Sequence, residues 1–265
     1  MDMREFIASP QEKPLDNLPQ NGGMTAILRT VAVVGDSLSS GEFEGTGEGG
    51  ITTYHDMYEH SWGQYMARMA GLTVYNFSRG GMTASEYCNS FAEANGFWDE
   101  KYAARAYIMA LGVNDIWNQN QPVGSVADIC FEDAQQNAPT FAGYFARIIQ
   151  HYRTMVPDAP VFLLTMPRDS GATPERARLA DAHAALMYEM AAVFSHCYVI
   201  DLRRYAPEYD AAFKQQFFLG GHMNACGYLL TARMVAAYID YIIRTHPDDF
   251  RQIGFVGTPY RNTKA

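Results

Sequence analysis

The chain has 265 residues, of which 48% are hydrophobic, so it is long enough to bury the core of one large α/β domain. Its formal net charge of −9 argues against a nucleic-acid partner, and no cluster of basic residues offers a local exception. The sequence contains no run of 18 apolar residues, so we expect no membrane span.

The two ends of the chain differ in composition from its middle. Residues 1–25 carry three prolines and a Gly-Gly pair, which predicts an irregular arm before a domain over 26–246 and a polar tail over 247–265. The first residues lack a positively charged segment leading into an apolar core, so a secretory signal is not expected. The 4 cysteines are widely spaced, which favours free thiols and a cytoplasmic location.

Strand and helix signals alternate along the chain, as a doubly wound parallel sheet requires. Apolar segments predict strands at about 30–35, 72–76, 105–111, 160–165 and 197–201. Periodic apolar patterns predict helices near 57–70, 83–93, 139–156, 174–195 and 223–245, with a short candidate near 205–217. Together these elements predict one α/β domain.

The first predicted strand ends at Gly35-Asp36-Ser37. A serine at the end of a buried strand is how an open α/β sheet presents a nucleophile, although the same residues also form ordinary turns. The Gly-rich segment 41–54 follows directly and is expected to be a mobile loop that walls the site. A serine alcohol needs a base, and His222 fits because it lies on a loop before the last predicted helix.

Attack on an ester carbonyl creates an oxyanion, which must be met by backbone N–H groups or side-chain amides. Two loops that follow predicted strands offer such donors. One is Asn76-Phe77-Ser78-Arg79-Gly80-Gly81, and the other is Gly112-Val113-Asn114-Asp115.

These four blocks, in this order, resemble the SGNH (GDSL) hydrolase superfamily over roughly residues 31–236. The resemblance implies a flavodoxin-like, five-stranded α/β/α sandwich and serine-dependent hydrolysis of an ester or thioester. It assigns Ser37 as nucleophile, Gly81 as backbone donor, Asn114 as amide donor and His222 as base. We expect no cofactor and no metal ion.

One departure from the family pattern concerns the residue that orients the histidine. Members usually carry an aspartate three residues before the histidine, where this chain has Leu219. We therefore expect a Ser37/His222 dyad in which a main-chain carbonyl holds the imidazole. Asp201 and then Asp169 are the alternative carboxylates, although Asp201 is more simply explained as a helix N-cap.

Three charged residues stand next to these site residues. Asp36 and Asp115 are expected to accept backbone N–H bonds that hold their loops in shape. Arg79 is expected to be solvated rather than in contact with substrate.

The substrate is the least determined feature. Tyr54, Trp62 and Trp117 suit stacking against sugar rings, although the tryptophans could equally be core residues. We favour a short-chain ester of a small molecule or carbohydrate, most simply an O-acetyl group. The alternatives are a lysophospholipase or thioesterase of the same superfamily and, in a different class, a non-catalytic binding protein. The sequence leaves the oligomeric state open.

Two short motifs imitate other functions. Residues 45–50 match Gly-x-Gly-x-x-Gly by letter, but no helix follows to receive a dinucleotide phosphate. His55 and His60 are five residues apart and would not share a metal ion on one helix.

Overall fold

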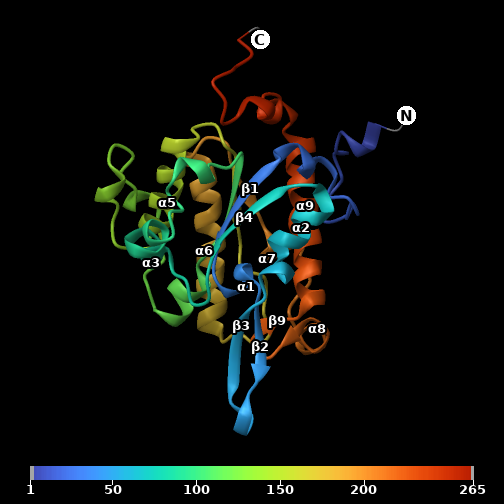
Figure 1. The fold of residues 1–265 in the computed structure, drawn as a ribbon, viewed down its shortest axis with the longest axis vertical. Helices are drawn as coiled ribbons and strands as arrows, with labels where there is room; N and C mark the ends of the chain where they lie inside the picture. The colour runs from blue at the N-terminus through green and yellow to red at the C-terminus, as the bar shows by residue number, and fades with distance from the viewer. Residues whose placement is uncertain (1–2, 264–265) are drawn as a thin grey trace.

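The computed structural model describes residues 3–263 and has a central sheet with helices on both faces (Figure 1). The outermost residues of the predicted arm and tail, 1–2 and 264–265, lie outside the described residues. The sheet consists of β1 (Thr30–Gly35), β4 (Thr73–Ser78), β5 (Ala106–Ala110), β6 (Val161–Leu164) and β7 (Cys197–Ile200). All its strand pairs are parallel, and the strand order is β4-β1-β5-β6-β7. This is the flavodoxin-like order, so the predicted fold is confirmed.

Helices α5 (Phe141–Met155) and α6 (Pro174–Val193) cover one face of the sheet (Figure 1). Ala32 and Val34 of β1 point into this layer and are fully buried. Because successive residues of a strand face opposite sides, the residues between them belong to the other layer.

The opposite face is covered by α2 (Trp62–Ala70) and α9 (Ala225–Thr245). Val31 and Val33 of β1 pack in this layer. Within residues 3–263, α9 is the one helix long and apolar enough to meet the length and composition of a membrane span, but 72% of its most apolar window is buried inside the fold. The helix therefore has the burial of a core helix.

The shorter helices are α1 (Ser37–Ser40), α3 (Ala84–Glu86), α4 (Ala92–Ala94), α7 (Leu202–Tyr205) and α8 (Ala211–Phe217). The helix predicted over 83–93 is α3 continued by a π-type turn into α4. The helix predicted from residue 57 starts only at Trp62, because the Ser61 hydroxyl caps it by accepting the Gln64 N–H at 3.3 Å.

The segment 41–54, predicted as a loop, is largely an antiparallel hairpin of β2 (Glu42–Thr46) and β3 (Thr52–Asp56). It projects away from the sheet beyond α1, at the lower end of the view in Figure 1. Two interactions fix its base. The Phe43 ring packs on Tyr228 of α9 at 5.5 Å between centroids, and the Ser40 hydroxyl donates to Asp56 at 2.6 Å. The prediction of a loop was wrong because the two segments form an antiparallel ladder from the Glu42–Asp56 pair to the Thr46–Thr52 pair.

The N-terminal arm is attached to α9 by a buried cluster of charges. The Arg244 side chain is 1% exposed and pairs with Asp240 at 2.8 Å and with Glu12 of the arm. The second Asp240 oxygen accepts the Met24 N–H at 2.7 Å. These contacts hold the segment before β1 against the helix layer.

Removal of Arg244 should be strongly destabilising because it leaves the Asp240 carboxylate buried without its cation. We expect Arg244→Ala to lower the free energy of unfolding by about 3–5 kcal/mol in urea titrations. The matched control is Arg178→Ala, which breaks an exposed pair with Glu175 and should cost less than about 1 kcal/mol. Equal decreases in the free energy of unfolding in the two variants would show that the buried cluster does not stabilise the fold more than an exposed ion pair does.

Candidate active site

Four loops meet at the carboxyl edge of the sheet and line one groove of about 660 Å³. They follow β1, β4 and β5 or precede α9, and they bring Ser37, Gly81, Asn114 and His222 to the same groove. This edge is where open α/β sheets bind ligands. The structure therefore brings together all four residues that the sequence singled out.

Ser37 is the first residue of α1, and its position is fixed by the residues around it. The Asp36 side chain caps the helix by accepting the Leu38 N–H at 3.0 Å, as expected for this residue. Burial raises the pKa of Asp36 to about 6. Gly41 ends the helix with φ of 89°, where a Cβ would approach the Met57 carbonyl oxygen to 2.9 Å.

Gly81 and Asn114 present hydrogen-bond donors on the same groove wall. Gly81 has φ of 71°, and its N–H makes no hydrogen bond within residues 3–263. One Asn114 N–H donates to the Met82 carbonyl oxygen at 3.2 Å, and its amide oxygen accepts from Asn118 at 2.8 Å. The Asn114 amide is thus held from both ends, and its second N–H hydrogen is left for a ligand.

Asp115 ties the loop after β5 to α3. Its Oδ1 accepts the Ala84 N–H at 2.8 Å, which confirms the expected structural role. Burial, with a smaller contribution from the nearby Asp36 carboxyl, raises the pKa of Asp115 to about 7.

The substitution Asp115→Asn keeps the oxygen that accepts the Ala84 N–H but removes the carboxyl group that titrates. The pKa of Asp115 is about 7 in the folded protein, against a usual value of 3.8. The folded state therefore binds this proton more tightly, and the stability that it contributes is lost as pH rises from about 4 to about 7. We expect Asp115→Asn to gain stability relative to wild type over this range, by at most about 1.4 kcal/mol per pH unit in urea titrations. A stability difference independent of pH would refute this assignment.

His222 lies between two carboxylates of the hairpin. Its Nδ1 is 2.8 Å from Glu44 Oε1, and its Nε2 is 3.0 Å from Glu42 Oε1. The Tyr54 ring and the imidazole are nearly perpendicular, with 5.6 Å between their centroids. The expectation that a main-chain carbonyl orients the imidazole was therefore wrong: Glu44 occupies that position.

The loop before His222 is shaped around the Glu44 carboxylate. The Gly221 N–H donates to Glu44 Oε1 at 2.7 Å, so one oxygen atom holds both the loop and the imidazole. A Cβ at Gly220, where φ is 65°, would overlap the other oxygen of Glu44. Gly220 and Gly221 therefore leave the space that the Glu44 carboxylate occupies.

The two carboxylates proposed from the sequence lie elsewhere. Asp201 caps α7 by accepting the Arg204 N–H at 3.0 Å, which confirms its interpretation as an N-cap. Asp169 pairs with Lys214 at 2.6 Å. Leu219 is 44% exposed and pairs with His222 in a short ladder of β8 (Phe218–Leu219) and β9 (His222–Met223). None of the three supplies an acid to the imidazole.

The sequence did carry a signal for Glu44. Glu42 and Glu44 are two residues apart on one strand, so both point to the same side of it. Polar and apolar residues alternate in Glu42-Phe43-Glu44, and Thr52, Thr53 and Tyr54, which favour strands, follow Gly47-Glu48-Gly49-Gly50, so the segment fits a hairpin with a Gly-rich turn.

The other residues near the site have separate partners. Arg79 lines the groove but pairs with Glu86 at 2.7 Å, so it is less free than expected. Trp62 is 1% exposed in the core. The Trp117 indole donates to the Arg176 carbonyl oxygen at 3.1 Å, outside the groove lining. Of the three aromatic candidates, only Tyr54 lines the groove.

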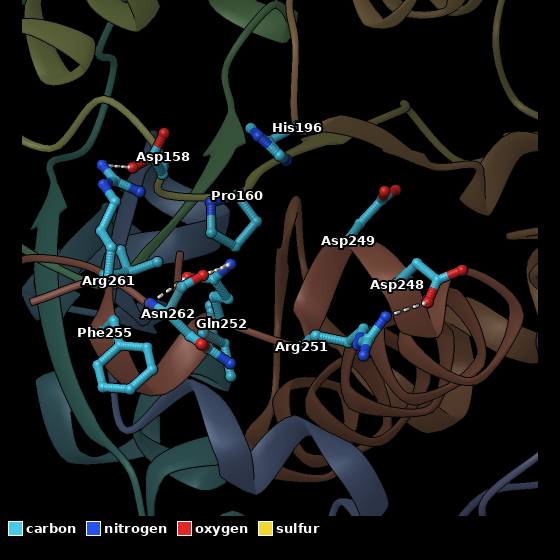
Figure 2. A pocket seen from close by; sticks show the side chains of 12 residues that line it. Asp158, Pro160, His196, Asp248, Asp249, Arg251, Gln252, Phe255, Arg261 and Asn262 are labelled. Carbon is cyan, nitrogen blue, oxygen red and sulfur yellow. Dashed lines mark hydrogen bonds and ion pairs between the residues drawn. The ribbon is translucent and has the colours of Figure 1, made fainter. Parts of the chain in front are cut away.

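A second cavity, of about 410 Å³, lies at the opposite edge of the sheet (Figure 2). Pro160 and His196, which precede β6 and β7, line it, and the Arg261 side chain reaches across to Asp158. Its other walls come from the C-terminal tail. Within residues 3–263, no group of three His, Cys, Asp or Glu side chains could hold a metal ion there or elsewhere.

Solved structures with this fold include a family two carbohydrate esterase from Clostridium thermocellum in complex with cellohexaose. It is 17% identical with a TM-score of 0.57, over 81% of this chain and 64% of that chain. A carbohydrate esterase family 2 enzyme plus carbohydrate binding domain from Corynascus thermopiles (Myceliophthora fergusii) is 15% identical with a TM-score of 0.56, over 81% and 66%. The psychrotrophic esterase EstA from Pseudoalteromonas sp. is 13% identical with a TM-score of 0.53, over 82% and 100%. At these identities the likeness shows the fold.

A search of curated protein sequences finds no match. The model of the GDSL-like Lipase/Acylhydrolase family matches residues 33–230, about three quarters of the chain. This span contains Ser37, Gly81, Asn114 and His222. The chain therefore belongs to the GDSL-like lipase/acylhydrolase family, and it is a carboxylic ester hydrolase.

Proposed function

We propose that the protein is a serine esterase that hydrolyses short-chain carboxylic esters through an acyl-enzyme on Ser37, with His222 as the base. The observation that carries this proposal is the convergence of a strand-end serine, a carboxylate-held histidine and two oxyanion donors on one groove. These are the parts that acyl transfer needs.

In the first half of the reaction the Ser37 Oγ proton passes to His222 Nε2 while Oγ attacks the ester carbonyl carbon. The carbonyl oxygen becomes an oxyanion that accepts hydrogen bonds from the Gly81 N–H and the Asn114 Nδ2–H. The C–O bond to the alcohol then breaks, and the alcohol takes the proton from Nε2. A water molecule repeats these steps on the acyl-enzyme, releasing the acid and restoring the Ser37 hydroxyl.

Glu44 serves as a positioning residue through Nδ1. Its carboxylate accepts the Nδ1–H bond, which leaves Nε2 as the basic nitrogen, and its charge stabilises the imidazolium that forms in the transition state. Glu42 has a different effect because it faces Nε2 itself. While His222 Nε2 carries a proton that it donates to Glu42, it cannot accept the proton of Ser37. The hydrogen bond between Nε2 and Glu42 must therefore break before catalysis.

The groove favours an ester whose alcohol part is a carbohydrate, most simply an O-acetyl ester. The groove is wide and lined mainly by polar side chains, with Tyr54 as an exposed ring against which a sugar could stack. The structurally similar family two carbohydrate esterase in complex with cellohexaose supports the same class.

All four cysteines are free, in keeping with the cytoplasmic location expected from the sequence.

The first test compares the hydrolysis of p-nitrophenyl acetate, butyrate and octanoate. Wild type should prefer the short esters, Ser37→Ala should abolish turnover, and Asn114→Ala should lower kcat by roughly 10²-fold through the lost oxyanion donor. An organophosphonate should label Ser37 in the wild type. Absence of both labelling and turnover would favour the non-catalytic binding protein instead.

The two glutamates of the hairpin provide a matched pair of variants on opposite sides of one imidazole. We expect Glu44→Ala to lower kcat by about 10²-fold or more, because Nδ1 and the imidazolium lose their carboxylate. Glu42→Ala should raise kcat/KM by a few-fold, because it removes the competing acceptor from Nε2. Equal losses in the two variants would mean that the carboxylates act through the hairpin fold rather than through the separate ring nitrogens.

A further inference from the structure

Asn114, the proposed amide donor of the oxyanion hole, lies on a single π-type helical turn, Val113–Asn118, which we call the Asn114 turn. The turn begins at Gly112, where φ is 135° and no side chain is present to cap it. Turns of this type are rare and often lie at functional sites. Because one helical turn is unstable by itself in water, its shape depends on the contacts that hold it from outside.

Helix α6 holds the start of the Asn114 turn through His183. The Nε2 atom of His183 is 3.2 Å from the Leu111 carbonyl oxygen. A carbonyl oxygen can only accept, so Nε2 carries a proton. Burial lowers the pKa of His183 to about 4, so the ring is neutral. The ring also lies against Gly112, where a Cβ would come within 2.8 Å of Nε2.

The same helix holds the other end of the turn through Trp117. The Trp117 indole donates to the Arg176 carbonyl oxygen at 3.1 Å, and the Arg176 guanidinium lies 5.4 Å from the centroid of the ring. Arg176 and His183 are seven residues apart, about two helical turns, so they lie on one face of α6. This face therefore holds the chain both before and after Asn114.

Neither His183 nor Trp117 lines the groove. The His183 side chain is 0% exposed, and its Nδ1 has no hydrogen-bond partner in the described part of the chain. An apolar side chain of similar size would fill this place without leaving a buried nitrogen unpaired. The hydrogen bond to Leu111 therefore explains a histidine here better than packing alone does.

We propose that His183 and Trp117 are positioning residues that hold the Asn114 turn so that the Asn114 Nδ2–H points at the oxyanion. Their effect on the reaction passes through Asn114, because neither residue lines the groove. A small displacement of a group that contacts the transition state is enough to slow the reaction. This inference rests on the proposed function, and it gives Trp117 a role other than stacking against a sugar.

The first test is Trp117→Phe, which removes the indole N–H but keeps an aromatic ring. With p-nitrophenyl acetate we expect kcat to fall about five- to ten-fold, the effect of one hydrogen bond, with KM unchanged. This ester contains no sugar, so lost stacking could not cause the decrease. The matched control is Trp98→Phe, next to His151 of α5, which should keep the wild-type kcat. A wild-type kcat in Trp117→Phe would overturn the role of Trp117.

Two substitutions of His183 separate its hydrogen bond from its packing. His183→Leu fills the space without a donor and should lower kcat about ten-fold, because the Leu111 carbonyl loses its donor. His183→Gln carries an amide N–H that can reach this carbonyl and should recover most of the loss. Melting temperatures show whether each variant is folded, and Trp117→Phe tests the same face of α6 if His183→Leu is not. Equal losses in the Leu and Gln variants would contradict a role for the hydrogen bond.

Double variants show whether the two residues act through Asn114. In the Asn114→Ala background, Trp117→Phe and His183→Leu should have little further effect on kcat, because the amide that they position is gone. In the Glu44→Ala background their effects should be as large as in the wild type. Full effects in both backgrounds would mean that the residues support the fold in general, and the inference would fail.

Hydrogen exchange tests the contact independently of activity. The Ile116 and Gln119 N–H groups donate to the Gly112 and Asn114 carbonyl oxygens, each at 2.9 Å. Their exchange should become several-fold faster in Trp117→Phe and His183→Leu, while exchange in β1 stays unchanged. Unchanged exchange in both variants would refute the inference.

The two proposals can fail separately. If Asn114→Ala lowers kcat but the α6-facing variants keep the wild-type kcat, the positioning role fails and the esterase proposal stands. If Asn114→Ala keeps the wild-type kcat, the oxyanion role of Asn114 fails, and faster exchange in Trp117→Phe would still show that α6 holds the turn.

Discussion

The hydrogen bond between Glu44 and His222 joins segments that are 178 residues apart in the chain. The same carboxylate oxygen also accepts the Gly221 N–H, so imidazole, loop and hairpin share one point of attachment. The hairpin in turn rests on α9 through Phe43 and on α1 through Asp56. The imidazole is thus held by a carboxylate from near the start of the domain, whereas members of this family usually carry an aspartate three residues before the histidine.

The sheet and the meeting of the four candidate site residues at its carboxyl edge were predictable because their signals are local. Each strand is an apolar run bounded by turn residues, and Ser37, Gly81 and Asn114 lie on the segments that follow such runs. Parallel strands then bring these ends to one edge. Glu44 was not predicted because a carboxylate was expected at the end of a sheet strand, whereas Glu44 lies in a segment whose glycines predicted a loop. The place of the hairpin against α9 depends on the contact between Phe43 and Tyr228, which no local pattern contains.

Two buried carboxyl groups support the loops around the groove. Asp36, which lines the groove, accepts the Leu38 N–H of α1, and Asp115 accepts the Ala84 N–H of α3. Burial raises the pKa of both carboxyls, so the rigidity of the loops is obtained with groups that resist ionisation. With Glu42 and Glu44 nearby, the site holds several carboxyls around a single imidazole, and an additional anionic group on a substrate would be disfavoured.

The hairpin of β2 and β3 carries the acid on an element that contributes little to the hydrophobic core. A two-stranded ribbon is only marginally stable by itself, and this one is held mainly at its base. Opening of the ribbon would withdraw Glu42, Glu44 and Tyr54 from the imidazole at once while the sheet stays folded. With Glu44 in the proposed positioning role, opening of the ribbon alone would remove the carboxylate from His222 Nδ1, and heat or denaturant would silence the enzyme before the domain unfolds.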